Sequence, residues 1–324
     1  MTNPKVTVAL TTYNRPVYLK LAIDAILAQS YKEFEFLILD NGSESETEEL
    51  IKTYTDKRIK YVRNNTNTRE FVNVAWDLAN GEYLIITHDD DIMKKDMLEK
   101  EIAILDTHHD VIGVSCNNTS IDSNGKVILE KTFPLDSPLL INQFEYCHYY
   151  LNEGIYLIFP SLLMRKSFFA KNNLKFELHV GPGADTYLWM KANLLPYSFY
   201  ILDEPLYYYR FHDKQDSFIN GNSLSLDLFE ALFDLFIGVR YLKNLDRIIN
   251  RLLRNYVINY HFKLITKEIY NKKVDLLITK LKLMKHQNKL LFLAFIFKNF
   301  TFMFLIYYRI LIRLRSLKAS FKVL

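Results

Sequence analysis

The order of apolar and polar positions predicts strands and helices that alternate along the first hundred residues. Short apolar runs rich in β-branched residues predict buried strands at 5–10, 34–39, 59–62 and 83–87. Longer stretches with an apolar face predict helices at 17–29, 46–54 and 71–79. Alternation of this kind is typical of an α/β fold, in which a mostly parallel, Rossmann-like sheet is covered by helices on both faces.

The pattern continues less regularly after residue 95. It predicts helices at 96–107, 141–152, 165–172 and 186–194. It also predicts strands at 111–117 and 196–206, a hairpin at 120–129, and an apolar segment at 155–164 that returns to the sheet. From residue 223 onward the pattern is helical and rich in Leu, Phe and Ile. We therefore expect an α/β domain at 1–220 and a helical C-terminal region at 221–324.

Polar residues follow several of the predicted strands. Asn14, Asp40 and the triplet Asp89-Asp90-Asp91 each come at the carboxyl end of a strand, the edge where open α/β sheets bind ligands. Three adjacent carboxylates repel one another unless a cation or hydrogen-bond donors lie among them, and Mg²⁺ and Mn²⁺ prefer oxygen ligands. The triplet therefore predicts a metal–diphosphate site. The alternative is an acidic turn that caps the next helix.

Another carboxylate comes much later in the chain. Asp185 follows the loop Gly181-Pro182-Gly183-Ala184 and precedes the helix predicted at 186–194. This flexible loop delivers an acid to the start of the helix, a position that suits a helix N-cap.

Five motifs stand in order along residues 4–215. They are Thr11-Thr12-Tyr13-Asn14-Arg15-Pro16, Leu39-Asp40-Asn41-Gly42-Ser43, Asn80-Gly81-Glu82-Tyr83 leading to Asp89-Asp90-Asp91, Ala184-Asp185 with Leu188-Trp189, and Tyr209-Arg210 with His212. Together they resemble the inverting family 2 glycosyltransferases, which have the GT-A fold. Ala184 stands where many relatives have Glu, which bears on acceptor positioning. The Gln-x-x-Arg-Trp segment of processive synthases is absent, which favours a single sugar addition.

The resemblance implies a site for a nucleotide sugar, with UDP as the expected nucleotide. Asp40 would accept a hydrogen bond from the uracil N3–H, and the alternative is an Asx turn with the residues that follow it. The other expected nucleotide contacts are Thr11, Tyr13, Arg15, Asp89 and Asp90. For Tyr13 the alternative is packing, and for Arg15 it is a solvated loop charge.

The resemblance also implies a divalent cation, Mn²⁺ or Mg²⁺, that bridges the donor diphosphate. Asp91 is the first expected ligand, and Asp89 is directed at the ribose or the metal. For Asp90 the alternative is that its side chain faces the protein. The cation would take up charge as the sugar–phosphate bond breaks.

On the acceptor side, the resemblance implies that Asp185 is the general base. Trp189 would stack on a sugar ring, although a helical Trp is more commonly a core residue. Arg210 beside His212 predicts contacts with phosphate or metal, and Arg69 is a further phosphate candidate.

Composition restricts the class of protein. The 324 residues are 49% hydrophobic and 24% charged, as in ordinary globular proteins. Cys116 and Cys147 lack metal-site spacing, which favours free thiols in a reducing compartment. The N-terminus lacks the long apolar run of a signal peptide. Neither a P-loop nor a Gly-x-Gly-x-x-Gly motif follows the first strand, which disfavours a dehydrogenase.

The C-terminal tail differs from the rest of the chain in charge. After Asp275 there are ten Lys and Arg residues and no acid, whereas the preceding part has 31 basic and 37 acidic residues. The apolar stretch 290–308 contains Lys298, which would cost about 3 kcal/mol at a membrane centre. We therefore expect a helix that lies on the membrane surface, with packing on the catalytic domain or a homo-oligomer interface as alternatives. The tail is too apolar for a nucleic-acid-binding arm.

The sequence thus predicts an inverting hexosyl- or N-acetylhexosaminyl-transferase. It would move a sugar from a UDP-sugar to a glycan or lipid-linked acceptor in cell-surface polysaccharide or glycoconjugate synthesis, at the cytoplasmic face of the membrane. A nucleotidyltransferase acting on sugar phosphates is one alternative, but Thr11–Pro16 is not the Gly-rich basic loop it would need. A non-catalytic nucleotide-sugar-binding scaffold is the other.

Overall fold

The computed structural model describes residues 4–213 together with residues 215, 228, 231, 232 and 235. By its contacts the chain divides into two units, Met1–Leu232 and Phe233–Leu324. Almost all described residues belong to the first unit. The expected boundary near residue 220 and the expected membrane-surface tail lie outside the described residues. Within the described residues, no helix combines the length and apolar character needed to cross a membrane.

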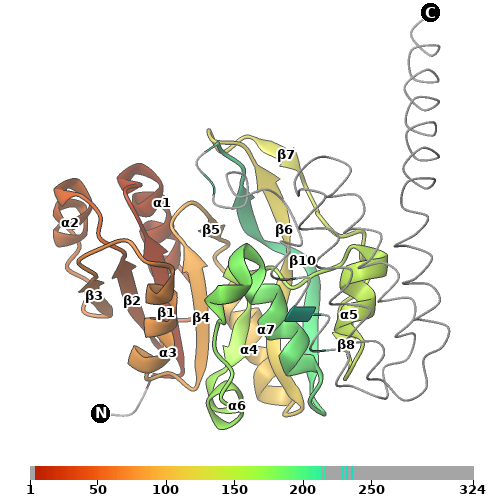
Figure 1. The fold of residues 1–324 in the computed structure, drawn as a ribbon. Coiled ribbons are helices and arrows are strands. Elements are labelled where there is room, and N and C mark those ends of the chain that lie inside the picture. The colour runs from red at the N-terminus through yellow and green to blue at the C-terminus, as the bar shows by residue number, and fades with distance from the viewer. Residues whose placement is uncertain (1–3, 214, 216–227, 229–230, 233–234, 236–324) are drawn as a thin grey trace, which may run out of the picture. The chain divides into compact units, whose positions relative to one another are not determined.

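The described part is an α/β structure with one ten-stranded sheet. Its strands are β1 Val6–Thr12, β2 Phe34–Asp40, β3 Ile59–Arg63, β4 Tyr83–His88, β5 Ile92–Met93, β6 Val111–Ile121, β7 Val127–Leu129, β8 Leu139–Ile141, β9 Leu163–Arg165 and β10 Ser198–Arg210. The main path runs β3-β2-β1-β4-β9-β6-β10-β5, with β7 beside β6 and β8 beside β10 (Figure 1). β1, β2, β3 and β4 are parallel neighbours, and β9 runs antiparallel between β4 and β6. The predicted, mostly parallel sheet is confirmed.

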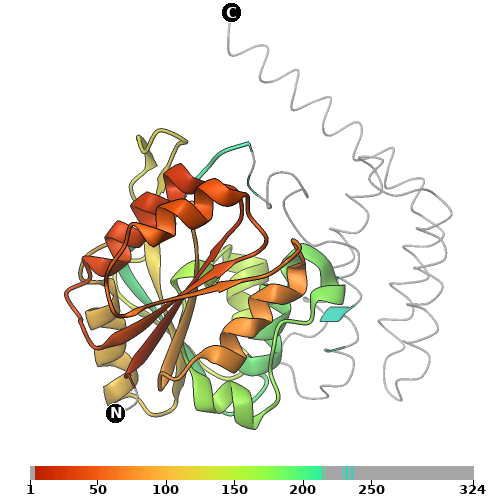
Figure 2. The same cartoon turned by 90° about the vertical axis from the view of Figure 1, so that its left-hand side faces the viewer.

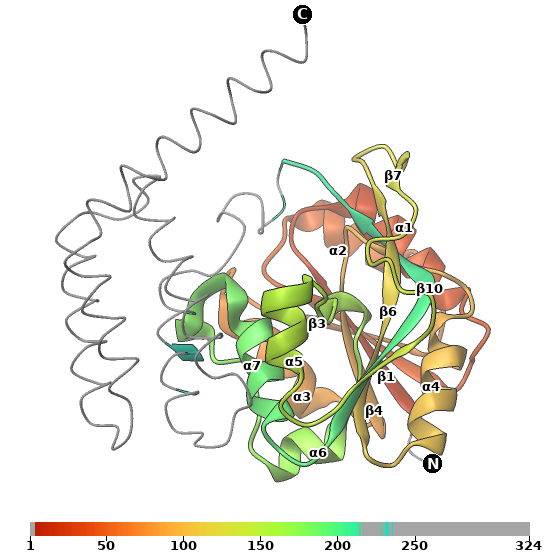
Figure 3. The ribbon, with the colours of Figure 1, turned by 90° about the vertical axis from the view of Figure 1, so that its right-hand side faces the viewer.

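Helices cover both faces of this sheet. They are α1 Pro16–Leu27, α2 Ser45–Lys52, α3 Val74–Leu78, α4 Met97–Thr107, α5 Tyr146–His148, α6 Lys166–Lys171 and α7 Ala184–Asn193. Short 3₁₀ turns occupy Arg69–Asn73, Phe159–Ser161 and Leu178–Gly183, and a π turn occupies Tyr149–Glu153. Figures 2 and 3 show α1, α2 and α4 on one face, and α3, α6 and α7 on the other.

The core on the first face follows from alternation along the strands. Side chains from β1, β2 and β4 that point the same way join the apolar stripes of α1 and α4 in one cluster. In α1 this stripe is Leu19, Ala22, Ile23 and Ile26, and Pro16 occupies the first helical position, where its missing N–H costs nothing. Fully burying each aliphatic side chain contributes about 1.5–3 kcal/mol.

Three local predictions need correction. The helix expected at 141–152 is instead the short edge strand β8, then α5 and the π turn, because Ile141 pairs with Phe199 of β10. The helix expected at 71–79 is split into a 3₁₀ turn and α3. Strand β5 was not predicted, because two residues carry too little pattern to indicate a strand.

The fold gathers strand ends at one edge. Thr12 at the end of β1 lies opposite Asp40 at the end of β2, and Thr11 lies opposite His88 at the end of β4. On the far side of β9, Arg210 ends β10 opposite Ile121 of β6. Because these strands are parallel, their carboxyl ends form a single edge.

Candidate functional site

The acidic triplet occupies the turn between β4 and β5 at the carboxyl edge of the sheet. Asp89, Asp90 and Asp91 are all buried, with exposed fractions of 2%, 5% and 2%. Helix α4 begins only at Met97, with Asp96 at its N-cap position. The alternative that the triplet caps this helix is therefore wrong.

Asp89 faces the loop after β1. One carboxylate oxygen accepts hydrogen bonds from the Thr12 hydroxyl at 2.6 Å and the Tyr13 backbone N–H at 3.3 Å. The other accepts from Arg15 Nη1 at 2.9 Å. Burial raises the pKa of Asp89, and the charge of Arg15 opposes this rise. Asp89 therefore ties the loop after β1 to the end of β4.

Asp91 faces β10. Its carboxylate accepts hydrogen bonds from the Arg210 backbone N–H at 2.8 Å and from the Tyr207 hydroxyl at 3.2 Å. Tyr207 also lies 2.7 Å from the Thr87 hydroxyl. Burial and the neighbouring Asp90 charge raise the pKa of Asp91 well above its usual range. Both carboxylate oxygens of Asp91 thus have protein donors, and the residue fixes the triplet against β10.

Asp90 contacts an arginine and a histidine. Its Oδ2 is 2.5 Å from Arg15 Nη1 and 3.0 Å from His212 Nε2. Burial alone would raise the pKa of Asp90, but the hydrogen bond with His212 and the charge of Arg15 hold it below its usual range. Among the three acids, Asp90 is therefore the one kept in its anionic form by its surroundings.

Arg210 links the triplet to the hairpin between β6 and β7. Its Nε donates to the Asp90 backbone carbonyl at 2.7 Å, and its Nη1 donates to the Asp122 carbonyl at 3.1 Å. Its guanidinium also lies 4.7 Å from the centre of the Tyr18 ring. Arg210 is 2% exposed, and these contacts hold it between the triplet and the hairpin.

Asp40 lies at the end of β2 and is fully buried. One oxygen accepts from the Ser43 backbone N–H at 2.8 Å, which is the turn contact considered from the sequence. The other accepts from the Tyr61 hydroxyl at 2.6 Å. Asp40 therefore shapes the loop after β2 whether or not a nucleotide also contacts it.

Exposed residues surround this edge. Tyr13 is 40% exposed and Arg69 is also exposed. The segment before Arg69 is joined to the Asp40 loop, because Asn41 Nδ2 donates to the Thr68 carbonyl at 2.8 Å. The Thr11 hydroxyl lies 3.2 Å from the Thr87 carbonyl and 2.8 Å from His88 Nδ1. The structure thus brings Tyr13, Arg69 and Thr11, which the sequence predicts to contact the nucleotide sugar, to one edge.

Asp185 lies in the first turn of α7, after Gly183 at the N-cap position. Burial raises its pKa to about 6, although the Thr186 N–H and its own N–H favour the charged form. Its charge raises the pKa values of Tyr146 and Tyr150, whose shifts arise first from burial. A carboxylate with this pKa can accept a proton near neutral pH.

Trp189 is a core residue. It is fully buried, and its ring centre lies 6.0–6.3 Å from those of Phe159, Phe169, Phe176 and Phe199. The structure thus favours the core alternative over stacking on a sugar. Phe159 also contacts the His88 ring, at 5.3 Å. This aromatic cluster therefore connects the helix that carries Asp185 with the end of β4.

At this edge the described residues offer few ligands to a divalent metal ion. Among the described residues, no group of three or more His, Cys, Asp or Glu side chains is arranged to hold a metal ion. One or two carboxylates with substrate phosphates remain a common arrangement for Mg²⁺ and Mn²⁺. The Asp90–His212 pair fits that arrangement, since it presents one anionic carboxylate and one imidazole.

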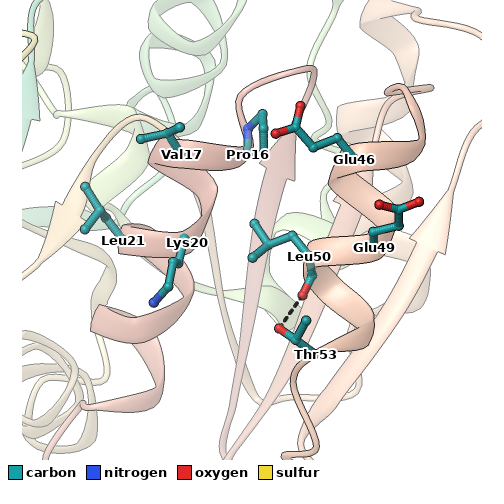
Figure 4. A pocket seen from close by; sticks show the side chains of 8 residues that line it. All are labelled: Pro16, Val17, Lys20, Leu21, Glu46, Glu49, Leu50 and Thr53. Atoms are coloured by element: carbon teal, nitrogen blue, oxygen red, sulfur yellow. Dashed lines mark hydrogen bonds between the residues drawn. The ribbon is translucent and has the colours of Figure 1, made fainter.

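A surface groove lies between α1 and α2, apart from the triplet. It has a volume of about 550 Å³, and Figure 4 shows Leu50 of α2 facing α1 across it. Of the predicted site residues none lines this groove. The candidate site is therefore the carboxyl edge of the sheet.

Sequence reasoning missed several residues that hold the site. Thr12, Tyr61 and Tyr207 each donate a hydroxyl hydrogen to a site carboxylate. Thr12 stood inside a recognised motif and was open to prediction. The Tyr207 hydroxyl donates to Asp91, which lies 116 positions earlier in the sequence, and no local pattern predicts such a contact.

The chain is similar to known and predicted glycosyltransferases. The family model described as "Glycosyl transferase family 2" matches residues 7–172. An uncharacterized glycosyltransferase of Methanocaldococcus jannaschii is 31% identical over 222 residues, which cover 67% of this chain and 74% of that protein. An uncharacterized glycosyltransferase of Rickettsia typhi is 30% identical over 241 residues, or 72% of each chain.

A third relative is named for its activity. The poly(ribitol-phosphate) beta-N-acetylglucosaminyltransferase TarS of Staphylococcus aureus is 26% identical over 214 residues, which cover 63% of this chain and 35% of TarS. The crystal structure of TarS 1–349 with UDP-GlcNAc matches with a TM-score of 0.68 at 19% identity. It covers 89% of this chain and 83% of that chain. This structural likeness establishes the fold.

Proposed function

This chain belongs to glycosyl transferase family 2 and has the GT-A fold, and we propose that it transfers a sugar from a UDP-sugar donor to an acceptor hydroxyl with inversion. The observation that carries the proposal is the arrangement at the carboxyl edge of the sheet. There the anionic Asp90 lies between Arg15 and His212, and the loops after β1 and β2 meet beside it.

The expected nucleotide position follows from the same edge. The exposed ring of Tyr13 is suited to a flat base, and Arg15 is suited to a phosphate, because a guanidinium recognises phosphate oxygens. TarS, a relative, has been crystallised with UDP and with UDP-GlcNAc, which supports UDP as the nucleotide here. Asp40, Thr11 and Arg69 would complete the nucleotide site.

Mn²⁺ or Mg²⁺ would be held jointly by the protein and the donor diphosphate. The sequence favoured Asp91 and Asp89 as ligands, but their carboxylates accept hydrogen bonds on both oxygens. We therefore place Asp90 and His212 first among the protein ligands. The cation would offset negative charge on the leaving UDP.

The proposed chemistry is a single displacement. An acceptor oxygen forms a bond to the anomeric carbon, the bond from that carbon to the phosphate oxygen breaks, and UDP leaves. Asp185 takes the proton of the acceptor hydroxyl. Its pKa of about 6 keeps it ionised and basic at neutral pH.

The surroundings of Asp185 support a glycan acceptor. Tyr156 is 41% exposed and rests edge-on against Phe133, with ring centres 5.0 Å apart. Burial raises the pKa of Tyr150, and the nearby Asp185 and Tyr156 raise it further. Exposed aromatic rings offer apolar faces that suit sugar rings. We place the reaction in cell-surface polysaccharide or glycoconjugate synthesis, with a lipid-linked glycan and the inner membrane face as the expected setting.

Thermal unfolding with a panel of nucleotide sugars tests the proposal. Each nucleotide is added with Mn²⁺, with Mg²⁺ and with EDTA. A donor at one hundred times its dissociation constant stabilises the folded protein by about 2.7 kcal/mol, so UDP-sugars should raise the midpoint in the presence of metal. The proposal fails when no UDP-linked nucleotide binds with either metal. A nucleotidyltransferase would instead be stabilised by nucleoside triphosphates.

A further inference from the structure

The loop between β1 and α1 contains an unusual backbone conformation at Asn14. Its φ angle is 53°, in the left-handed region that non-glycine residues rarely adopt and that Asn tolerates better than most. Asn14 separates Tyr13, which is exposed, from Arg15, which turns inward to the acidic triplet. The left-handed conformation of Asn14 therefore lets the side chains on either side of it face different parts of the proposed donor site.

Two hydrogen bonds hold Asn14 to the loop after β2. Its backbone N–H donates to Ser43 Oγ at 3.0 Å, and its side-chain oxygen accepts from the Glu44 N–H at 2.8 Å. The Ser43 N–H in turn donates to Asp40 at 2.8 Å. Asn14 thus connects the loop that carries Arg15 with the loop that is fixed by Asp40.

The connection continues beyond these two loops. Arg63 at the end of β3 donates to the Ser43 carbonyl at 2.6 Å. Arg15 donates to Asp89 and Asp90 at the end of β4. Four neighbouring strand ends, β3, β2, β1 and β4, are therefore joined through Asn14, Ser43 and Arg15.

We propose that Asn14 is a positioning residue for the nucleotide donor. It holds the loop after β1 against the loop after β2, so that Tyr13 and Arg15 are placed before the donor arrives. The inference rests on the proposed function, because it deepens the description of the same donor site. Asn14 itself is exposed and its side chain is held by a single backbone N–H, so replacing it leaves the core of the sheet intact.

Three substitutions separate the two properties of Asn14. Asn14→Gly keeps access to the left-handed region but removes the side-chain acceptor. Asn14→Ala removes both, and Asn14→Asp keeps both. Asn173→Ala is the matched control, because Asn173 is also exposed and left-handed, with a φ of 52°, but ends α6 away from the donor loops.

The measurement is UDP affinity by calorimetry in Mn²⁺, at a temperature where every variant is folded. We expect Asn14→Ala to weaken UDP binding by about tenfold, because one hydrogen bond and the backbone preference are lost together. Asn14→Gly should show a smaller loss, and Asn14→Asp should recover most of the affinity. Asn173→Ala should lower the thermal midpoint through the lost backbone preference alone, with UDP affinity unchanged.

Two outcomes would overturn the inference. One is wild-type UDP affinity in Asn14→Ala, and the other is an equal loss of affinity in Asn173→Ala. Failure of the wild-type protein to bind UDP would contradict the proposed function, and with it this inference. Binding by the wild type with no effect at Asn14 would contradict the inference alone.

Discussion

His212 and Asp90 are joined at 3.0 Å between Nε2 and Oδ2, although 122 positions separate them in the sequence. The contact exists because β5, which follows the acidic triplet, pairs antiparallel with β10 at Ile92 and Tyr208. That pairing returns the segment after β10 to the end of β4. The imidazole also lies 5.3 Å from the Tyr18 ring of α1, which fixes its place. A metal held at this pair would sit where three elements meet.

Substitution of Asp90 tests the metal assignment. Asp90→Asn removes the anionic ligand but keeps the side-chain volume, so we expect Mn²⁺-dependent UDP affinity to fall by at least about tenfold. In EDTA the same variant should bind UDP as well as the wild type or better, because a negative charge beside the diphosphate is gone. Calorimetry with and without metal measures both effects.

Asp91→Asn is the companion variant, since it changes the adjacent carboxylate in the same way. An Asn there can still accept the hydrogen bond from the Arg210 N–H. We expect it to retain metal-dependent binding. Loss of metal dependence in Asp91→Asn, together with its survival in Asp90→Asn, would restore Asp91 as the ligand.

Asp185→Asn separates an enzyme from a binding scaffold. General-base catalysis contributes about 10²–10⁴-fold, so the transfer rate should fall by this factor while UDP affinity stays unchanged. The fold should tolerate the change, because burial disfavours the ionised carboxylate that Asn replaces. Asp136→Asn, in an exposed loop, is the control and should leave both quantities unchanged. Full transfer by Asp185→Asn would remove Asp185 from the mechanism.

The pH dependence of transfer gives an independent measure. Asp185 acts as a base when ionised, so kcat/KM should fall as pH decreases through about 6. An ordinary Asp would lose activity only near pH 4. Tyr146 and Tyr150 beside it stay neutral in this range, because burial raises their pKa values. His148 and His179 lie on elements that pack against α7, and a decline caused by either one would persist in Asp185→Asn.

As pH rises, the contribution of Asp185 to stability changes in the opposite direction to activity. A carboxyl whose pKa is higher in the folded state binds its proton more tightly there than in the unfolded chain. The contribution of Asp185 to the free energy of unfolding is therefore present at acidic pH and is lost as pH rises through 4 to 6. Activity and this stability term consequently change in opposite directions over the same interval.

The sequence predicted where the site lies better than how its residues are oriented. Asp40 and the triplet end apolar runs, and parallel strands bring their carboxyl ends to one edge. That placement required only the hydrophobic pattern. The orientation of each carboxylate depends on partners far along the chain, such as Tyr61 for Asp40 and Tyr207 for Asp91.

Strand β10 shows why these partners could not be predicted. Its pairing with β6 shifts register around Pro205, so the side chains that reach the triplet do not follow a simple alternation. Helix α7 poses a different problem, because most of its residues are buried and it has no polar stripe. Without such a stripe, the sequence cannot say which side of Trp189 faces protein.

Trp189 supports the site from the core, and its replacement should act on stability. Trp189→Ala would leave a large cavity among four Phe rings and should lower the free energy of unfolding by about 3–5 kcal/mol. Trp189→Phe should cost less, since much of the volume is kept and the indole N–H has no hydrogen-bond partner among the described residues. Urea unfolding measures both changes.

Acceptor kinetics distinguish this core role from sugar stacking. Under conditions where Trp189→Phe is fully folded, the acceptor KM should stay within about twofold of the wild type, because the ring is fully buried and cannot reach a ligand. Tyr156→Ala is the contrasting variant, since its ring is exposed beside Phe133 and its loss should raise the acceptor KM with little effect on unfolding. A raised KM in Trp189→Phe at unchanged stability would show that the indole meets the acceptor after all.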